Sequence, residues 1–343
     1  MCCSRTGASC CLAAVNRFVT VSLSPSTQQD HGTINSSQLS EHRLKWHRNR
    51  QQIVLERTNE KADILLKTME ITEQFLSEMG INLPYYDIDV KSTLDSADGR
   101  KYGLGSSGAV TVAAVKALLD AADVSLSDEA VFKLAAVTHI LLNSRGSLGD
   151  LAAATYTGWV AYTSPDKKRV KNKLNQMPLS SVLNEPWPKL SIERLPEPKS
   201  LELIVGWTGS PASTESYVAS VQQEQEKMNY QTFLAESRKC VRDLIDGLKT
   251  DDPERVKEAV HYNRTLLLEL SQEKNVVLET PLLERLTLIA DSHGAAAKTS
   301  GAGGGDCGIA LTDSAVQKAN ILKEWQENHI EPLPLSVYDR SNL

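Results

Sequence analysis

The sequence predicts a two-domain protein that mixes helices and strands. Its 343 residues exceed one ordinary core and fit two domains of common size. Alternating apolar residues in 86–94 predict a strand, whereas three-and-four spacing across 59–79 predicts an amphipathic helix. Six of the thirteen prolines lie in 164–200, where no periodicity persists. We therefore expect an atypical start at 1–11, a first domain at 12–165, a linker at 166–200 and a second domain at 201–343.

Composition excludes several classes of protein. Apolar residues make up 41% and charged residues 23%, which is typical of globular proteins. A net charge of -6 argues against binding nucleic acid through its phosphates. No apolar run approaches the roughly 18 residues that would span a membrane. Four of the six cysteines lie in the first eleven residues and the others stand alone, which favours a reduced, cytoplasmic protein.

The remaining elements of the first half follow from local patterns. Residues 12–23 are rich in apolar and β-branched residues and predict one strand, and 24–40 predicts a polar, turn-rich connection. Apolar residues cover nearly every side of 110–119, which predicts a helix enclosed by other elements. Ser127, followed by two acidic residues, predicts the start of a helix that ends near Asn143. Gly146 to Asp150 opens an alanine-rich helix.

In the second half, the same reasoning predicts a strand at 201–207, a loop at 206–214 and four helices near 215–227, 230–248, 253–273 and 281–293. A glycine-rich turn at 301–305 and a strand at 308–311 follow.

The loop between strand 86–94 and helix 110–119 reads Gly103-Leu104-Gly105-Ser106-Ser107-Gly108-Ala109. Its GxGxxG pattern alone is weak evidence, since dinucleotide-binding folds and protein kinases share it. A dinucleotide site is disfavoured because about a hundred residues precede the loop, and the protein-kinase motifs His-Arg-Asp and Asp-Phe-Gly are missing. Ala109 stands where a P-loop needs lysine. Two interpretations of this loop remain: a phosphate-binding loop at the start of a helix, and a simple glycine-rich turn with helix-capping serines.

Two further loops favour the phosphate-binding interpretation. Gly301, Gly303, Gly304 and Gly305 fall within five positions, which is costly unless the backbone must approach something closely. The loop from Gly146 places Asp150 at the start of a small-residue helix, where a carboxylate could bind metal, act as a base or cap the helix.

Together, KYGLGSSGA, GSLGDLAAATYTGW and KTSGAGGGDCGIAL resemble the GHMP kinase superfamily, in order and in spacing. Within it, residues 206–214 and 32–38 resemble the phosphomevalonate kinases. The resemblance implies an α+β fold, with a first domain like the second domain of ribosomal protein S5, a ferredoxin-like second domain and an active site between them. It also implies phosphorylation of 5-phosphomevalonate by ATP with Mg²⁺. We expect a monomer or homodimer, with neither nucleic acid nor a membrane as a partner.

The resemblance assigns roles to residues of the three loops. We expect Asp150 and Lys101 to be catalytic, Lys101 as the first-choice cation, and Ser107 to be able to bind Mg²⁺. The expected ATP-binding residues are Gly103, Leu104, Gly105, Ser106, Ser107, Gly108 and Ala109. The expected substrate-binding residues are Arg145, Ser147, Ser210, Ser213, Thr214, Gly301, Ala302, Gly303 and Gly304.

Residues 1–11 depart from the family pattern, which begins with a strand and a Pro-Gly-Lys segment. From this we expect an edge strand of the first domain and a family lysine to be missing. Two alternative functions therefore stay open: a GHMP kinase acting on an alcohol such as mevalonate, and a nucleotide-binding pseudokinase.

Overall fold

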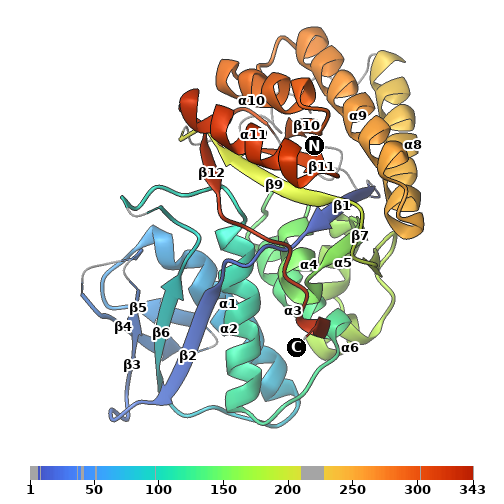
Figure 1. Cartoon of the computed structure of the whole chain (residues 1–343). Helices are drawn as coiled ribbons and strands as arrows, with labels where there is room; N and C mark the ends of the chain where they lie inside the picture. Colours follow the sequence, from blue (N-terminus) through green and yellow to red (C-terminus); the bar gives the residue numbers. More distant parts are fainter. Residues whose placement is uncertain are drawn as a thin grey trace.

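The computed structural model describes residues 7, 9–36, 38–39, 42–50, 52–96, 98–209, 228–301 and 303–342. Over these ranges the chain forms three sheets and two groups of helices. Figure 1 shows one group beside a five-stranded sheet and the other over a four-stranded sheet, with strands β1 and β7 where the two meet. This mixture of helices and sheets confirms the predicted α+β class.

The five-stranded sheet of the first half has the order β2-β6-β3-β4-β5. Its strands are β2 (Val19–Pro25), β3 (Gly32–Asn35), β4 (Leu44–Asn49), β5 (Gln52–Leu55) and β6 (Tyr86–Ser92). Helix α1 (Asp63–Glu78) and helix α2 (Ser106–Ala121) cover one face, where Met69 and Leu118 are fully buried against Ile88. Three strands lie in 24–55, so the expectation of a plain turn-rich connection over 24–40 was wrong at β3.

The segment 12–23, expected as one strand, is divided. Strand β1 (Ser9–Ala13) pairs with β7 (Trp159–Thr163), and β2 joins the five-stranded sheet. Between them Val15 forms an isolated bridge with Val337, and the Asn16 amide donates to the carbonyl of Ser336 (3.0 Å). The break is therefore caused by a chain segment more than 300 positions away, which local patterning does not reveal.

A second layer of the first half surrounds α2 with helices and a three-stranded sheet of order β1-β7-β8. Its elements are α3 (Asp128–Leu141), α4 (Gly149–Tyr156), α5 (Lys167–Leu174), α6 (Leu179–Asn184) and β8 (Ser191–Leu195). The Ser127 hydroxyl caps α3 by accepting from the Ala130 amide (3.3 Å), as predicted.

Most of the expected linker 166–200 is ordered structure of this layer, which differs from the expectation of an aperiodic connection. Val170 of α5, Val182 of α6 and Trp187, which follows α6, are buried in the same cluster as Phe132 of α3. Strand β8 pairs with β7 along its full length. Helices α5 and α6 are too short to give a periodic apolar pattern, so the six prolines of 164–200 were the strongest signal and predicted a linker.

The second half has a four-stranded antiparallel sheet of order β10-β11-β9-β12. Its strands are β9 (Glu202–Trp207), β10 (Ala296–Thr299), β11 (Cys307–Thr312) and β12 (Glu331–Leu333), and its helices are α8 (Met228–Thr250), α9 (Pro253–Lys274), α10 (Pro281–Ser292) and α11 (Ala315–Glu327). Strands β9 and β10 follow each other in the chain, but β11 lies between them in the sheet. Likewise β9 lies between β11 and β12. This is the split βαβ arrangement of a ferredoxin-like fold. The predicted topology is confirmed, and the expected helix at 215–227 lies outside the described residues.

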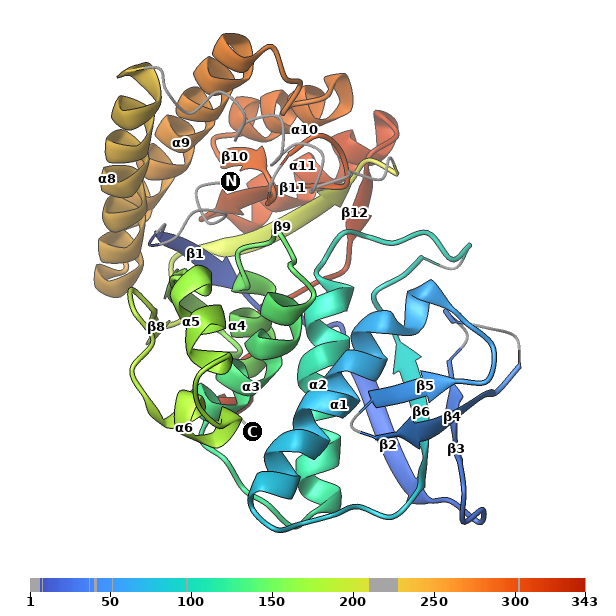
Figure 2. The same ribbon diagram turned by 180° about the vertical axis from the view of Figure 1, so that it is seen from behind.

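The two halves share a buried apolar cluster. It combines Trp159 and Leu195 of the three-stranded sheet with Leu248, Val256 and Leu311 of the second half. The C-terminal segment then returns across the first half, where Tyr338 packs edge-on against Phe18 (4.9 Å between ring centroids). Figures 1 and 2 both place the C-terminus beside α3 and α6, far from β12.

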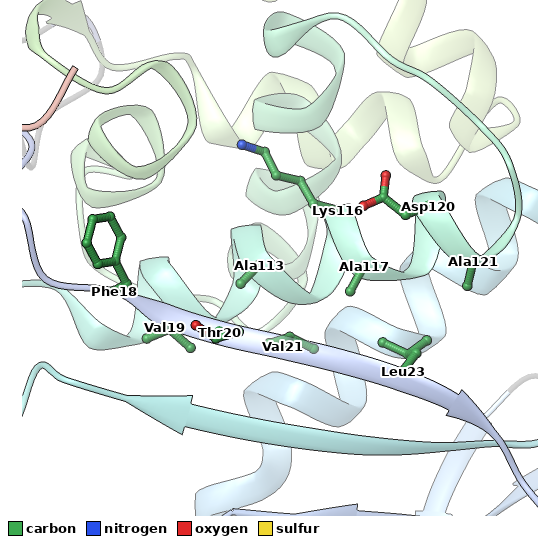
Figure 3. Close-up of a pocket in the computed structure, with 10 residues that line it drawn as sticks. All are labelled: Phe18, Val19, Thr20, Val21, Leu23, Ala113, Lys116, Ala117, Asp120 and Ala121. Atoms are coloured by element: carbon green, nitrogen blue, oxygen red, sulfur yellow. The ribbon is translucent and has the colours of Figure 1, made fainter. Parts of the chain in front are cut away.

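A groove of about 490 Å³ lies between β2 and the C-terminal part of α2. Figure 3 shows Val19, Val21 and Leu23 on its floor, with Lys116 and Asp120 at the helix side. The groove lies at the opposite end of α2 from the glycine loop. Among the described residues, no helix is long and apolar enough to cross a membrane.

Candidate active site

The glycine loop leads from β6 into α2. Gly103 and Gly105 have φ angles of +76° and +84°, a region that residues with a Cβ rarely adopt, and Gly105 is the N-cap of α2. The Ala109 amide is already bonded to the Gly105 carbonyl (3.1 Å). The preceding amides of the first turn are those that a helix leaves without an intrahelical acceptor, so the loop is suited to an anion. ATP binding by 103–109 stays a prediction that this geometry supports.

Asp150 lies directly against this loop. A Cβ at Gly108 would fall 2.5 Å from Asp150 Oδ2, and one at Gly105 would fall 3.2 Å from Asp150 Cβ. Asp150 stands in the first turn of α4 and is exposed. Only glycine at position 108 allows the carboxylate to approach the helix start this closely. The structure thus brings together two of the three loops that the sequence singled out.

The second glycine cluster approaches the same loop from the other half. A Cβ at Gly103 would lie 2.5 Å from Asp306 Cγ. The Asp306 carbonyl accepts from the amide and the hydroxyl of Thr208 (2.8 and 2.9 Å), which ties the cluster to the end of β9. All three loops therefore converge at the N-terminus of α2.

Residues 100–104 make further contacts with the second half. The Cys307 thiol donates to the Tyr102 carbonyl (3.2 Å), and burial raises the pKa of this thiol to about 12. The Tyr102 ring packs edge-on against Trp207 at 5.0 Å, and the Arg100 guanidinium lies 4.8 Å from the same indole. Leu104 packs against the cluster that contains Trp207 and Cys307. The glycine loop, which joins β6 and α2 of the first half, is therefore also fixed in position by contacts with the second half.

Within the second glycine cluster, the glycines are needed because the backbone packs closely against another backbone segment of the same half. Gly301, Gly303 and Gly304 all have positive φ, and a Cβ at Gly303 would lie 2.3 Å from the Leu278 carbonyl oxygen. The Gly304 amide donates to that same oxygen (2.7 Å), and the Gly303 amide donates to the Ser300 carbonyl (3.3 Å). These two amides are used inside the protein, so glycine is needed here to pack the turn. Their expected part in substrate binding stays a prediction.

The loop before α4 carries the expected residues Arg145 and Ser147. Arg145 is exposed, whereas Ser147 is half-buried and its hydroxyl accepts from the Gly149 amide (3.2 Å). Leu148 takes a left-handed conformation (φ 68°) and is buried. The hydroxyl hydrogen of Ser147 can still donate to a ligand, as the expected substrate role requires.

The cations near the two glycine loops differ in availability. Lys101, the expected catalytic cation, is exposed and forms a backbone bridge with Asp95 at the entrance to the glycine loop. Arg264 of α9, by contrast, is paired with Glu279 (3.0 Å) and with Asp291 of α10 (3.1 Å), which excludes it as a free cation. Four expected substrate residues, Ser210, Ser213, Thr214 and Ala302, lie outside the described residues.

A buried histidine behind the site was not predicted. The Thr111 hydroxyl donates to the Ser107 carbonyl (3.0 Å), so His139 Nε2, 3.1 Å away, must donate to Thr111. Burial lowers the pKa of His139, the nearby Lys167 charge lowers it further, and Asp150 opposes both. A neutral His139 therefore links α3 to the first turn of α2. Its spacing on an apolar helix is indistinguishable from that of an ordinary core residue.

The expected Mg²⁺ can be tested against the donors present. Within the described ranges, no cluster of three or more His, Cys, Asp or Glu side chains could hold a metal. Mg²⁺ in kinases is commonly held by one or two carboxylates together with substrate phosphates. Asp150, with the hydroxyl of Ser107 in the adjacent helix turn, fits such a shared site and not an all-protein one.

Comparison with known families agrees with this geometry. The model for the GHMP kinases N terminal domain matches residues 64–158, and that for GHMP kinases C terminal matches 244–331. The two matches lie in different halves of the chain and together include the glycine loop, Asp150 and the second glycine cluster. The chain belongs to the GHMP kinases.

Within that family, phosphomevalonate kinases are prominent relatives. The chain is 36% identical to phosphomevalonate kinase of Streptomyces sp. (strain CL190), over 95% of this chain and 90% of the relative. A crystal structure of a Listeria innocua protein superposes with a TM-score of 0.91 at 34% identity, over 98% of this chain and 93% of the other. Streptococcus pneumoniae phosphomevalonate kinase, in complex with phosphomevalonate and AMPPNP, gives 0.83 at 28% identity over 98% and 95%. The predicted resemblance is confirmed.

Proposed function

We propose that this chain transfers the γ-phosphoryl group of ATP to the phosphate of 5-phosphomevalonate. A phosphate oxygen of the acceptor forms a bond to the γ-phosphorus, and the β–γ bridging oxygen leaves with ADP. The convergence of three loops on the start of α2, with Asp150 against Gly108, supports this proposal. The 36% identity to a phosphomevalonate kinase over nearly the whole chain supports the choice of acceptor.

The chemistry of the acceptor sets what the protein must supply. A phosphomonoester has a second pKa near 6, so at neutral pH its attacking oxygen is already mostly ionised. A general base has little to remove, and the main obstacle is repulsion between two anions. The first-turn amides of α2 hold the ATP phosphates, while Lys101 and Arg145 provide exposed positive charge.

We assign Asp150 to orienting work rather than to proton abstraction. Held against Gly108, its carboxylate can bind the cation that accompanies ATP, with the Ser107 hydroxyl as a further oxygen donor. Mg²⁺ bound there would screen charge on the transferred phosphoryl group. Cytoplasmic location and a monomeric or dimeric state remain predictions.

The proposed reaction predicts ADP release that requires both phosphomevalonate and Mg²⁺. A coupled assay for ADP, with the product identified by mass spectrometry, measures it, and mevalonate serves as the alternative acceptor. If correctly folded protein is stabilised against heat by ATP but turns over neither acceptor, the chain is a nucleotide-binding pseudokinase. Turnover of mevalonate alone would instead assign it to the alcohol kinases.

Replacing Asp150 with asparagine is expected to lower kcat by about 10- to 100-fold. An essential general base would cost more, about 10²- to 10⁴-fold, because the acceptor would keep its proton. The measurement is kcat with phosphomevalonate at saturating ATP. Asp120→Asn, an equivalent change at an exposed position near the other end of α2, is the control and should leave kcat unchanged. A loss above about a thousandfold for Asp150→Asn contradicts the orienting role.

A further inference from the structure

The loop of residues 144–149, which carries Arg145 and Ser147, is held from behind by β7 and the segment that follows it. The Tyr162 hydroxyl and the Ser164 hydroxyl both donate to the Ser147 carbonyl, at 2.6 and 3.2 Å. Lys167, the first residue of α5, donates from Nζ to the carbonyls of Ser144 (2.9 Å) and Gly146 (2.8 Å). Three carbonyls of the loop are thus fixed by this one segment.

Lys167 differs from the other two donors because it is charged. Its side chain is half-buried, and within the part of the chain that the structure describes no carboxylate pairs with it. Burial lowers the pKa of this lysine, because removing the ammonium group from water disfavours its charged form. Neutral hydroxyls hold the same loop through Tyr162 and Ser164, so a charge is not needed merely to bind carbonyls.

The charge lies directly behind the loop, because Lys167 Nζ is 2.9 and 2.8 Å from the two carbonyl oxygens that flank Arg145. Both Asp150 and Lys167 act electrostatically on His139, one raising and the other lowering its pKa. An ammonium has three donors, of which two are used by Ser144 and Gly146. A half-buried cation that has no carboxylate partner among the described residues, next to a loop expected to bind an anion, has its charge compensated when the anion binds.

We infer that Lys167 is a positioning residue for the acceptor: it fixes the loop of residues 144–149 and holds behind it a positive charge that the phosphomonoester dianion neutralises. The inference rests on the proposed function, because it takes this loop as the acceptor site. Lys167 acts through the loop and through its charge, without touching the reacting atoms.

The test compares three variants with the wild-type protein. Lys167→Met removes both donors and charge, and Lys167→Arg retains both. Lys168→Met, on the exposed neighbouring residue of α5, is the matched control. For Lys167→Met we expect the KM for phosphomevalonate to rise about tenfold or more, while the KM for ATP changes less than about twofold. Lys167→Arg should restore most of the loss, and Lys168→Met should behave as wild type.

A purely structural role gives a different result. If Lys167→Met raises both KM values together, or if Lys167→Arg is as impaired as Lys167→Met, the inference is overturned. Should Lys167→Met fail to fold, Lys167→Gln retains an N–H donor without the charge, and direct titration with phosphomevalonate gives its affinity. Wild-type affinity in that variant also overturns the inference. Failure of the wild-type protein to bind phosphomevalonate contradicts the proposed function itself.

Discussion

Replacing Gly108 with alanine is expected to lower kcat/KM by about 10- to 100-fold. The added Cβ would lie 2.5 Å from Asp150 Oδ2 and 2.7 Å from its Cγ, so the carboxylate must leave its place beside the helix start. Displacing a group in an active site by about 1 Å costs on the order of 10²-fold in rate. Because the carboxylate is the end of an exposed side chain, the fold itself should be retained. Steady-state kinetics and thermal unfolding measure the two effects separately.

Gly80→Ala, at an exposed position just after α1 and away from the site, is the control for adding a Cβ. Nothing lies within 4 Å of a Cβ built at position 80, so alanine meets only the strain of its left-handed backbone (φ +79°), about 1 kcal/mol. We expect this variant to keep activity within a few-fold of wild type. Equal losses of activity at positions 108 and 80, or activity within tenfold of wild type for Gly108→Ala, would show that Asp150 need not lie where the structure places it.

Replacing Gly303 with alanine is expected to lower the free energy of unfolding by about 2–4 kcal/mol and to impair catalysis as well. The backbone there has φ +78°, and a Cβ would lie 2.3 Å from the Leu278 carbonyl oxygen. That oxygen belongs to the backbone and also accepts from the Gly304 amide, so it cannot move without breaking the turn. Urea unfolding gives the change in stability, and kcat/KM reports the effect on the site.

Gly301→Ala separates steric conflict from backbone strain. Gly301 has φ +60°, but nothing lies within 4 Å of a Cβ built there. Alanine at this position should lower the free energy of unfolding by only about 1 kcal/mol, which is the cost of the left-handed backbone conformation. If both variants lose the same stability, the close contact with Leu278 does not contribute and the explanation given for the glycine cluster is wrong.

The parts of the fold that the sequence could predict are those fixed by neighbours in the chain. The all-round apolar pattern of 110–119 identified α2, and Ser127 identified the start of α3. Strand β3 was missed because residues 24–40 are polar and rich in turn-forming residues. In the structure Gly32 is needed because a Cβ there would lie 2.1 Å from the Tyr86 carbonyl oxygen and 2.5 Å from Trp46 Nε1. Both neighbours arrive from distant positions.

In the candidate site, too, local sequence patterns could be recognised, whereas contacts between distant residues could not. The three loops were identifiable because clustered glycines are costly and so indicate close approach, although the sequence could not say to what. At Gly108 the neighbour is a candidate catalytic carboxylate, and at Gly303 it is an ordinary backbone carbonyl. Lys167 had no signal of its own. It stands in a run of basic residues, and only the fold distinguishes it from the exposed Lys168.

The apolar cluster shared by the two halves bears on how the protein can move. Trp159 and Leu195 lie in the same buried group as Leu248, Val256 and Leu311, so separating the halves would expose this surface to water. Wide opening of one half against the other is therefore opposed along this seam. For the same reason we expect the two halves to unfold as one cooperative unit.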